Sequence, residues 1–133
     1  MFPDAQFIAA ASDAPALPGA YVLVIALAQS LVVTLPNHSR HVLEPGRYLY
    51  CGSARGPGGL RARLSRHMHS PKSIRWHVDR LTEAGRVDGA WVFPDGDECA
   101  LVASLPHLDA PIAGFGSSDC ARCRSHLLAW PRR

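Results

Sequence analysis

Short apolar runs separated by turn residues dominate the first half of the chain, and this pattern is typical of buried strands. Residues 21–28 are rich in Val, Ile and Leu but too few for an average helix, so they predict a strand. Residues 31–35 are expected to pair with this strand as a hairpin. Residues 36–45 are expected to form a loop, and residues 47–52 predict a third strand after the turn pair Pro45-Gly46.

The hydrophobic period changes to that of a helix after the Gly-Pro-Gly-Gly sequence at residues 56–59. The spacing i, i+3, i+4, i+7 then places four residues on one face of a helix that Pro71 ends: Leu60, Arg63, Leu64 and His67. Further along, the pattern predicts in order a helix at residues 73–83, a strand at 87–93, a helix at 98–105 and a final strand at 125–130.

This order of elements predicts a small α+β domain in which helices flank a central sheet of mixed or antiparallel strands. The length of 133 residues is that of one domain. Residues 1–18 are rich in Ala and Pro and are expected to form a loose amino-terminal arm. Residues 19–130 then form the domain itself, and residues 131–133 a tail.

Composition supports a globular domain, because 47% of the residues are hydrophobic and 19% are charged. The longest apolar stretch, residues 20–28, is far shorter than the roughly 20 residues of a membrane-spanning helix. No Lys or Arg precedes Arg40 to begin a signal peptide, and four cysteines are too few for a disulfide scaffold. We therefore expect a reduced, cytoplasmic enzyme or binding domain with no membrane partner.

The net charge of +3 conceals a strong asymmetry along the chain. Residues 55–80 carry seven Lys and Arg against one Asp, whereas residues 81–119 carry seven acids against one Arg. Such a distribution suits a site that attracts a polyanion and also holds a cation. It equally suits a domain whose two halves attract each other.

Three sequence motifs occur in a fixed order along the predicted elements. Gly-Ala-Tyr at residues 19–21 opens the first strand, Tyr-Cys-Gly-Ser at residues 50–53 closes the third, and Leu-x-x-Arg-x-x-x-His at residues 60–67 follows on the helix. In this order and spacing they resemble the motifs of the GIY-YIG nuclease superfamily. Between residues 19 and 130 the chain also resembles one small branch of that superfamily, whose members are found alone or fused to endonuclease III. The motifs that carry this second resemblance are Gly-Leu-x-Ala-Arg at residues 59–63, Trp-His-Val-Asp at 76–79, Glu-Cys at 98–99 and Gly-Phe-Gly-Ser-Ser-Asp-Cys at 114–120.

The resemblance implies a metal-dependent endonuclease that hydrolyses phosphodiester bonds in DNA, with RNA not excluded. It assigns a strand tyrosine, Tyr21 or Tyr50, as the general base, and it assigns Arg63 to the scissile phosphate. It places His67 at the same site and makes Glu98 the ligand of one Mg²⁺ or Mn²⁺ ion. The reaction needs these groups, since an activated water must attack in a fixed geometry and a cation must stabilise the developing charge. The fusion implies a role in DNA repair and, by analogy alone, a DNA-repair glycosylase as partner.

Each of these residue types also has a structural interpretation. Tyr21 and Tyr50 are also explained as core aromatics. Arg63 fits a surface arginine that extends its charge into solvent, although an arginine on the core-facing side of a helix is expensive to bury unless it meets an anion. Glu98 fits a first-turn acid that the helix dipole favours.

The chain departs from the superfamily pattern at Ser53, where many active members carry Lys or Arg, and Arg55 or Arg61 would have to substitute. Basic residues of the same segment form the predicted nucleic-acid-binding surface, which consists of Arg55, Arg61, Arg66, Lys72 and Arg75. Three further residues are expected to contact and orient the site residues without reacting themselves: His77, Asp119 and His126.

Cys120-x-x-Cys123, followed by His126, has the spacing of metal ligands. Zinc takes four ligands, so one such pair is half a site, which Cys99 or His77 would have to complete. We expect a reduced cysteine pair and no structural zinc. Two other functions stay open. A non-catalytic nucleic-acid-binding module would bind with salt-dependent affinity but not cleave, and a small protein-interaction domain would do neither.

Overall fold

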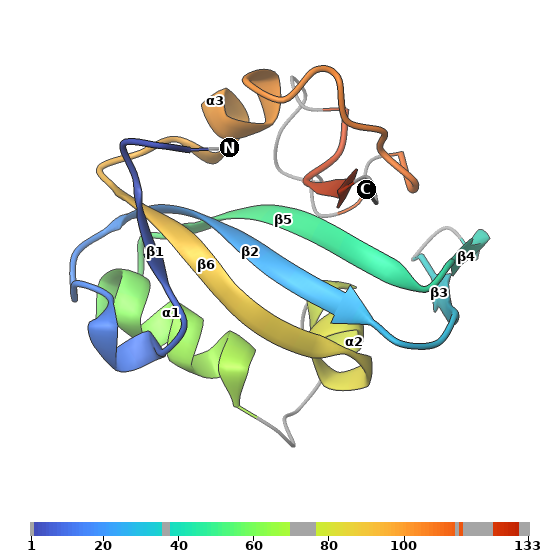
Figure 1. Ribbon diagram of the computed structural model, residues 1–133, viewed down its shortest axis with the longest axis horizontal. Coiled ribbons are helices and arrows are strands. Elements are labelled where there is room, and N and C mark those ends of the chain that lie inside the picture. Colours follow the sequence, from blue (N-terminus) through green and yellow to red (C-terminus); the bar gives the residue numbers. More distant parts are fainter. Residues whose placement is uncertain (1, 36–37, 70–76, 114, 116–123, 131–133) are drawn as a thin grey trace.

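The computed structural model describes residues 2–35, 38–69, 77–113, 115 and 124–130 (Figure 1). Its described helices and strands follow one another as β1 (Gln6–Ile8), a 3₁₀ helix (Ala11–Asp13), β2 (Gly19–Leu27), β3 (Leu31–Thr34), β4 (Arg40–Leu43), β5 (Gly46–Ala54), α1 (Gly59–Met68), α2 (His77–Ala84), β6 (Arg86–Pro94), α3 (Glu98–Ala103) and β7 (Leu127–Trp130). In this part of the chain, no helix has the length and apolar character needed to cross a membrane.

Five strands form the central sheet in the order β1-β6-β2-β5-β7, and each neighbouring pair is antiparallel. The expected α+β fold with helices flanking a sheet is therefore confirmed, and of the two sheet types expected, the structure has the antiparallel one. β2 lies at the centre of the sheet between β6 and β5. Its continuous apolar sequence follows from this place, because a strand covered on both faces has no solvent-facing side for polar residues.

Helices cover both faces of the sheet (Figure 1). α1 and α2 lie on one face, where Leu23 of β2 belongs to the same core as Leu60 of α1. α3 lies on the other face, where Val22 of β2 belongs to a second core with Leu101. Neighbouring residues of a strand point to opposite faces, so alternate positions of β2 enter different cores. Tyr21 therefore points to the α1 face.

The amino-terminal arm is held against the domain. β1 extends the sheet by pairing with β6, and Ala14 is fully buried. The carbonyl oxygen of Leu17 accepts a hydrogen bond from the backbone N–H of Leu60 (2.8 Å), and that of Pro15 accepts one from Arg61 (3.1 Å). The first N–H groups of a helix have no partner within it, so the arm completes the start of α1. The expectation of a loose arm over residues 1–18 was wrong because the arm supplies these partners.

Residues 31–35 were expected to pair with the first strand, and this was wrong. β3 pairs with β4 in a separate two-stranded sheet, so the predicted loop at residues 36–45 contains a strand. Both edges of β2 are already taken by β5 and β6, which leaves no edge for β3. In the hairpin, Val33 and Leu43 are buried whereas Val32 and Val42 are exposed, which is the alternation of a ribbon with one covered face.

The other elements lie close to those predicted. α3 ends at Ala103 rather than at residue 105, and β7 begins at Leu127 rather than at residue 125. α2 begins at His77, and residues 73–76 of the predicted helix lie outside the described residues.

Candidate functional site

Tyr21 lies with its ring across β5, above Gly52, on the face of the sheet that α1 covers. The two residues are directly opposite each other in the antiparallel register. A side chain at residue 52 would place its Cβ 2.4 Å from Tyr21 Oη and 2.5 Å from Tyr21 Cζ, which is too close for any real contact. Glycine at this position therefore allows the Tyr21 ring to occupy its buried place, where it is 1% exposed.

His67 meets the Tyr21 phenol from α1. Tyr21 Oη and His67 Nε2 are 2.7 Å apart, and both side chains are buried. His67 shares the buried face of α1 with Leu60 and Leu64, so the helical period carries it to the tyrosine. The contact lets a proton pass between the phenol and the ring nitrogen, since either group can donate, depending on the tautomer.

Tyr50 is the more accessible of the two tyrosines. It precedes Gly52 by two residues on β5, which directs its side chain to the same face as Tyr21. Its ring centroid lies 6.3 Å from that of His67 and 6.5 Å from that of His126. Its side chain is only partly buried, so Tyr50 lies between two histidines at a place that solvent can reach.

Arg63 lies one turn before His67 on α1 and is half-buried. Its Nη1 donates a hydrogen bond to the carbonyl oxygen of Ser53 over 3.0 Å, which ties the guanidinium to the end of β5. Its positive charge acts on both Tyr21 and Tyr50 in the direction of a lower pKa. The predicted arginine, the histidine and both tyrosines therefore share one site.

Burial dominates the titration of both phenols, and it raises the pKa of Tyr21 and of Tyr50 well above the ordinary value. For Tyr50 the next cause is the negative charge of Glu98, which also raises its pKa. The guanidinium of Arg63 opposes these effects without overcoming them. Both phenols are therefore protonated at neutral pH, and either would need further positive charge beside it to act as a base.

Glu98 begins α3, which lies on the opposite face of the sheet from α1 (Figure 1), and its negative charge raises the pKa of Tyr50. It is the first residue of α3, which Asp97 caps by accepting a hydrogen bond from the backbone N–H of Cys99 (3.2 Å). Glu98 Oε2 lies 3.7 Å from Nδ1 of His126, whose ring neighbours Tyr50. The carboxylate and the second histidine therefore border the tyrosine site.

Two arginines of the predicted nucleic-acid-binding surface make hydrogen bonds within the domain. Arg55 donates to the carbonyl oxygen of Gly96 (2.9 Å), in an exposed contact between two loops. Arg61 Nε donates to the carbonyl oxygen of Ala14 (2.8 Å), which adds to the contacts between α1 and the arm. Both side chains thus stabilise the fold, a role that the prediction of a nucleic-acid-binding surface did not include.

Arg66 forms an ion pair that the sequence analysis missed. Its Nη2 lies 2.5 Å from Oδ2 of Asp79, a side chain with no exposed surface, and the pair joins α1 to α2. Breaking a buried ion pair by removing one partner is costly, so Arg66 is bound into the fold. The signal for this pair was present, because Asp79 is the one acid among residues 55–80.

Several predicted residues lie outside the described part of the chain: Lys72, Arg75, Asp119, Cys120 and Cys123. The side chain of His77, at the start of α2, also lies outside it. Among the residues that the structure describes, no group of three or more His, Cys, Asp or Glu side chains is arranged to hold a metal ion. The expected absence of structural zinc stays a prediction.

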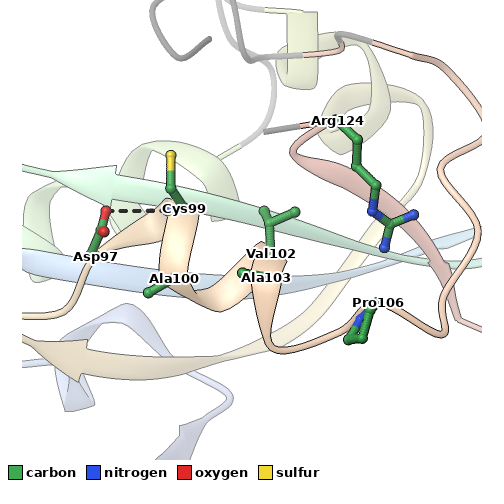
Figure 2. Close-up of a pocket in the computed structure, with 7 residues that line it drawn as sticks. All are labelled: Asp97, Cys99, Ala100, Val102, Ala103, Pro106 and Arg124. Carbon is green, nitrogen blue, oxygen red and sulfur yellow. Dashed lines mark hydrogen bonds between the residues drawn. The ribbon is translucent and has the colours of Figure 1, made fainter. Parts of the chain in front are cut away.

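A pocket of about 410 Å³ lies beside α3 (Figure 2). Its described lining consists of Asp97, Cys99, Ala100, Val102, Ala103, Pro106 and Arg124. The Arg124 guanidinium donates to the carbonyl oxygens of Leu105 (2.7 Å) and Leu108 (2.6 Å), and Asp97 caps the helix, so both charged groups already have partners. None of these described lining residues belongs to the tyrosine site.

A family model described as Domain of unknown function DUF123 matches residues 20–133, which is most of the chain. The chain therefore belongs to this family. No curated protein and no solved structure matches it significantly.

Proposed function

We propose that this DUF123 domain binds nucleic acid and hydrolyses phosphodiester bonds as a divalent-metal-dependent endonuclease of the GIY-YIG type. The observation that carries the proposal is the grouping of Tyr21 of β2, Tyr50 of β5, and Arg63 and His67 of α1, with the charge of Glu98 of α3 acting on both tyrosines. We further propose DNA as the substrate, with RNA as the alternative, and a cytoplasmic location. A DNA-repair glycosylase as partner rests on the analogy alone.

Arg63 suits a contact to the scissile phosphate. It is partly exposed at the border of the tyrosine site, and its hydrogen bond to the Ser53 carbonyl fixes its direction. A guanidinium is always charged and presents several donors in one plane, which matches the oxygens of a phosphate. A preorganised cation of this kind stabilises the negative charge that develops during phosphodiester hydrolysis.

Glu98 suits a divalent cation. Its side chain is 27% exposed and lies beside His126, a buried histidine neither of whose ring nitrogens has a hydrogen-bond partner among the described residues. A carboxylate next to an unsatisfied imidazole is a donor set that fits a divalent ion. When bound, the ion supplies positive charge for the phosphoryl oxygens and for the attacking water.

The tyrosines and His67 suit the handling of protons. Tyr50 is partly exposed, whereas Tyr21 is buried. The pKa of Tyr50 falls when the charge beside it changes from that of the Glu98 carboxylate to that of a bound cation. Behind it, His67 Nε2 lies 2.7 Å from Tyr21 Oη and can accept the proton of that phenol. We assign Tyr50 as the base and Tyr21 with His67 as its support.

Cleavage of DNA in the presence of Mn²⁺ or Mg²⁺ tests the proposal. We expect Arg63→Ala and Glu98→Gln each to reduce nicking at least about 100-fold, because each removes one charge contact of the transition state. Arg86→Ala and Asp109→Asn serve as matched controls, since both residues are exposed and neither lines the tyrosine site. Full activity of either site variant, with the fold intact, would remove that residue from the mechanism.

Binding of nucleic acid without cleavage is the second candidate function. It is favoured by the burial of Tyr21 and by the raised pKa of both phenols, which keeps them protonated. Under this alternative, affinity falls with salt concentration but no divalent ion induces nicking. A cleavage assay and a salt titration of binding, carried out on the same preparation, distinguish the two functions.

A further inference from the structure

His126 is a buried polar side chain whose ring nitrogens have no hydrogen-bond partner among the described residues. The residue is 2% exposed, and neither Nδ1 nor Nε2 has a hydrogen-bond partner among the described residues. Buried polar groups in proteins are nearly always hydrogen-bonded, so a histidine in this condition calls for a partner of another kind. Imidazole nitrogens that lack hydrogen bonds are good metal ligands.

The backbone holds His126 in place on both sides. Its carbonyl oxygen accepts a hydrogen bond from the backbone N–H of Cys51 on β5, and its own N–H donates to the carbonyl oxygen of Phe115, each over 2.9 Å. The hydrogen bond with Cys51 continues the pairing of β7 with β5 by one residue. The ring is held with its Nδ1 3.7 Å from Glu98 Oε2 and with its centroid 6.5 Å from that of Tyr50.

The separation of His126 Nδ1 and Glu98 Oε2, 3.7 Å, is longer than a hydrogen bond but suits two ligands of one ion. Two donor atoms about 2.1 Å from a shared cation are about 3.0 Å apart at a right angle and about 3.6 Å apart at an angle of about 120°. The two atoms are therefore at a distance that one divalent ion spans with little movement of either side chain.

We propose that His126 is a second protein ligand, beside Glu98, for the divalent cation of this domain, and that this donor pair selects a first-row transition ion such as Mn²⁺ over Mg²⁺. The inference rests on the proposed role of Glu98. Mg²⁺ prefers oxygen ligands and keeps its water shell, whereas an imidazole nitrogen favours transition ions. Two protein ligands leave the other positions of the ion to water and to a phosphate oxygen.

Titration of the metal-free protein with Mn²⁺, followed by the electron paramagnetic resonance signal of the free ion, tests the proposal without any substrate. We expect one Mn²⁺ per chain and a nitrogen coupling from imidazole in the spectrum of the bound ion. His126→Phe, which keeps an aromatic ring but removes both nitrogens, should abolish that coupling and weaken Mn²⁺ binding at least about tenfold. His107→Phe is the matched control, because His107 is an exposed histidine.

Selectivity gives a second measurement that a merely structural histidine would not change. His126→Asp replaces the nitrogen with oxygen, so the preference for Mn²⁺ over Mg²⁺ should fall at least about tenfold while binding persists. Bound Mn²⁺ without nitrogen coupling in the wild-type protein overturns the proposal even if every variant fails to fold.

The two proposals fail in different ways. If Glu98→Gln abolishes Mn²⁺ binding and His126→Phe leaves it unchanged, His126 is no ligand and the proposed function stands. If Glu98→Gln leaves Mn²⁺ binding unchanged, the metal site of the proposed function is wrong, and the inference about His126 falls with it.

Discussion

Replacing Gly52 with alanine tests the packing on which the whole site depends. The added Cβ would lie 2.4 Å from Tyr21 Oη and 2.5 Å from Tyr21 Cζ, whereas unstrained carbon contacts are about 3.5 Å or longer. The Tyr21 ring must therefore move by about 1 Å within a closely packed core. Overpacking of this kind costs about 1–3 kcal/mol, and the loss of the hydrogen bond to His67 costs about 1 kcal/mol more. We expect a total destabilisation of about 2–4 kcal/mol.

Urea unfolding followed by tryptophan fluorescence measures this loss, because Trp91 and Trp130 lie 5.8 Å apart, ring to ring, on the sheet. Gly56→Ala is the matched control, since a Cβ at residue 56 meets no atom within 4 Å. It should change the free energy of unfolding by less than about 1 kcal/mol, and a small gain is the expected direction.

A double-mutant cycle assigns the cost to the contact between the two residues. Tyr21→Leu removes the ring atoms that the new Cβ would meet, so Gly52→Ala should cost much less in that background than in the wild type. We expect an interaction energy of about 2 kcal/mol. Equal costs of Gly52→Ala in both backgrounds, or a cost no larger than that of Gly56→Ala, would refute the account of why residue 52 is glycine.

Two further predictions follow from buried charges and phenols. Arg66→Met should destabilise the domain by about 3–5 kcal/mol in urea unfolding, because it removes the ion-pair partner of the fully buried Asp79 carboxylate. Asp79→Asn should cost less, and a larger cost for Asp79→Asn would contradict the structural role given to this ion pair. The raised pKa of Tyr21 and Tyr50 means that the unfolded chain loses these protons first as the pH rises above about 10, so the free energy of unfolding should fall from there upward. Tyr21→Phe should reduce that slope by about 1 kcal/mol per pH unit between pH 10 and 11, where the unfolded phenol is only partly ionised, and an unchanged slope would count against the burial of this phenol.

The parts of the site that lie on one strand or one helix could be predicted from the sequence. Tyr50 and Gly52 share a face because they are two residues apart on a strand, and Arg63 and His67 lie together because they are four apart on a helix. Glu98 is different, because it begins a helix on the opposite face of the sheet. No periodicity in the sequence relates it to the tyrosines, and only the resemblance of the motifs indicated its role.

Two of the errors have a common physical origin, which is competition between strands for edges. Residues 31–34 have the composition of a strand, but the pattern does not say that β5 and β6 fill both edges of β2. β1 has only three residues, too few for a period, and its place depends on an edge that β6 offers. The ion pair of Arg66 with Asp79 escaped prediction for another reason, since it joins two helices whose relative position the sequence does not state.

The contacts also bear on the charge asymmetry of the chain. Arg55 and Arg61 hold loops and the amino-terminal arm, and Arg66 holds α2, so much of the described basic segment serves the fold. Arg63, a described member of that segment, acts on both tyrosines, and the carboxylate of Glu98 opposes it there. One positive and one negative charge attract a phosphate weakly, whereas a divalent cation on the carboxylate turns the balance positive. Under the proposed function, a bound metal ion therefore raises the affinity for nucleic acid. By thermodynamic linkage, bound nucleic acid raises the affinity for the metal ion by the same factor.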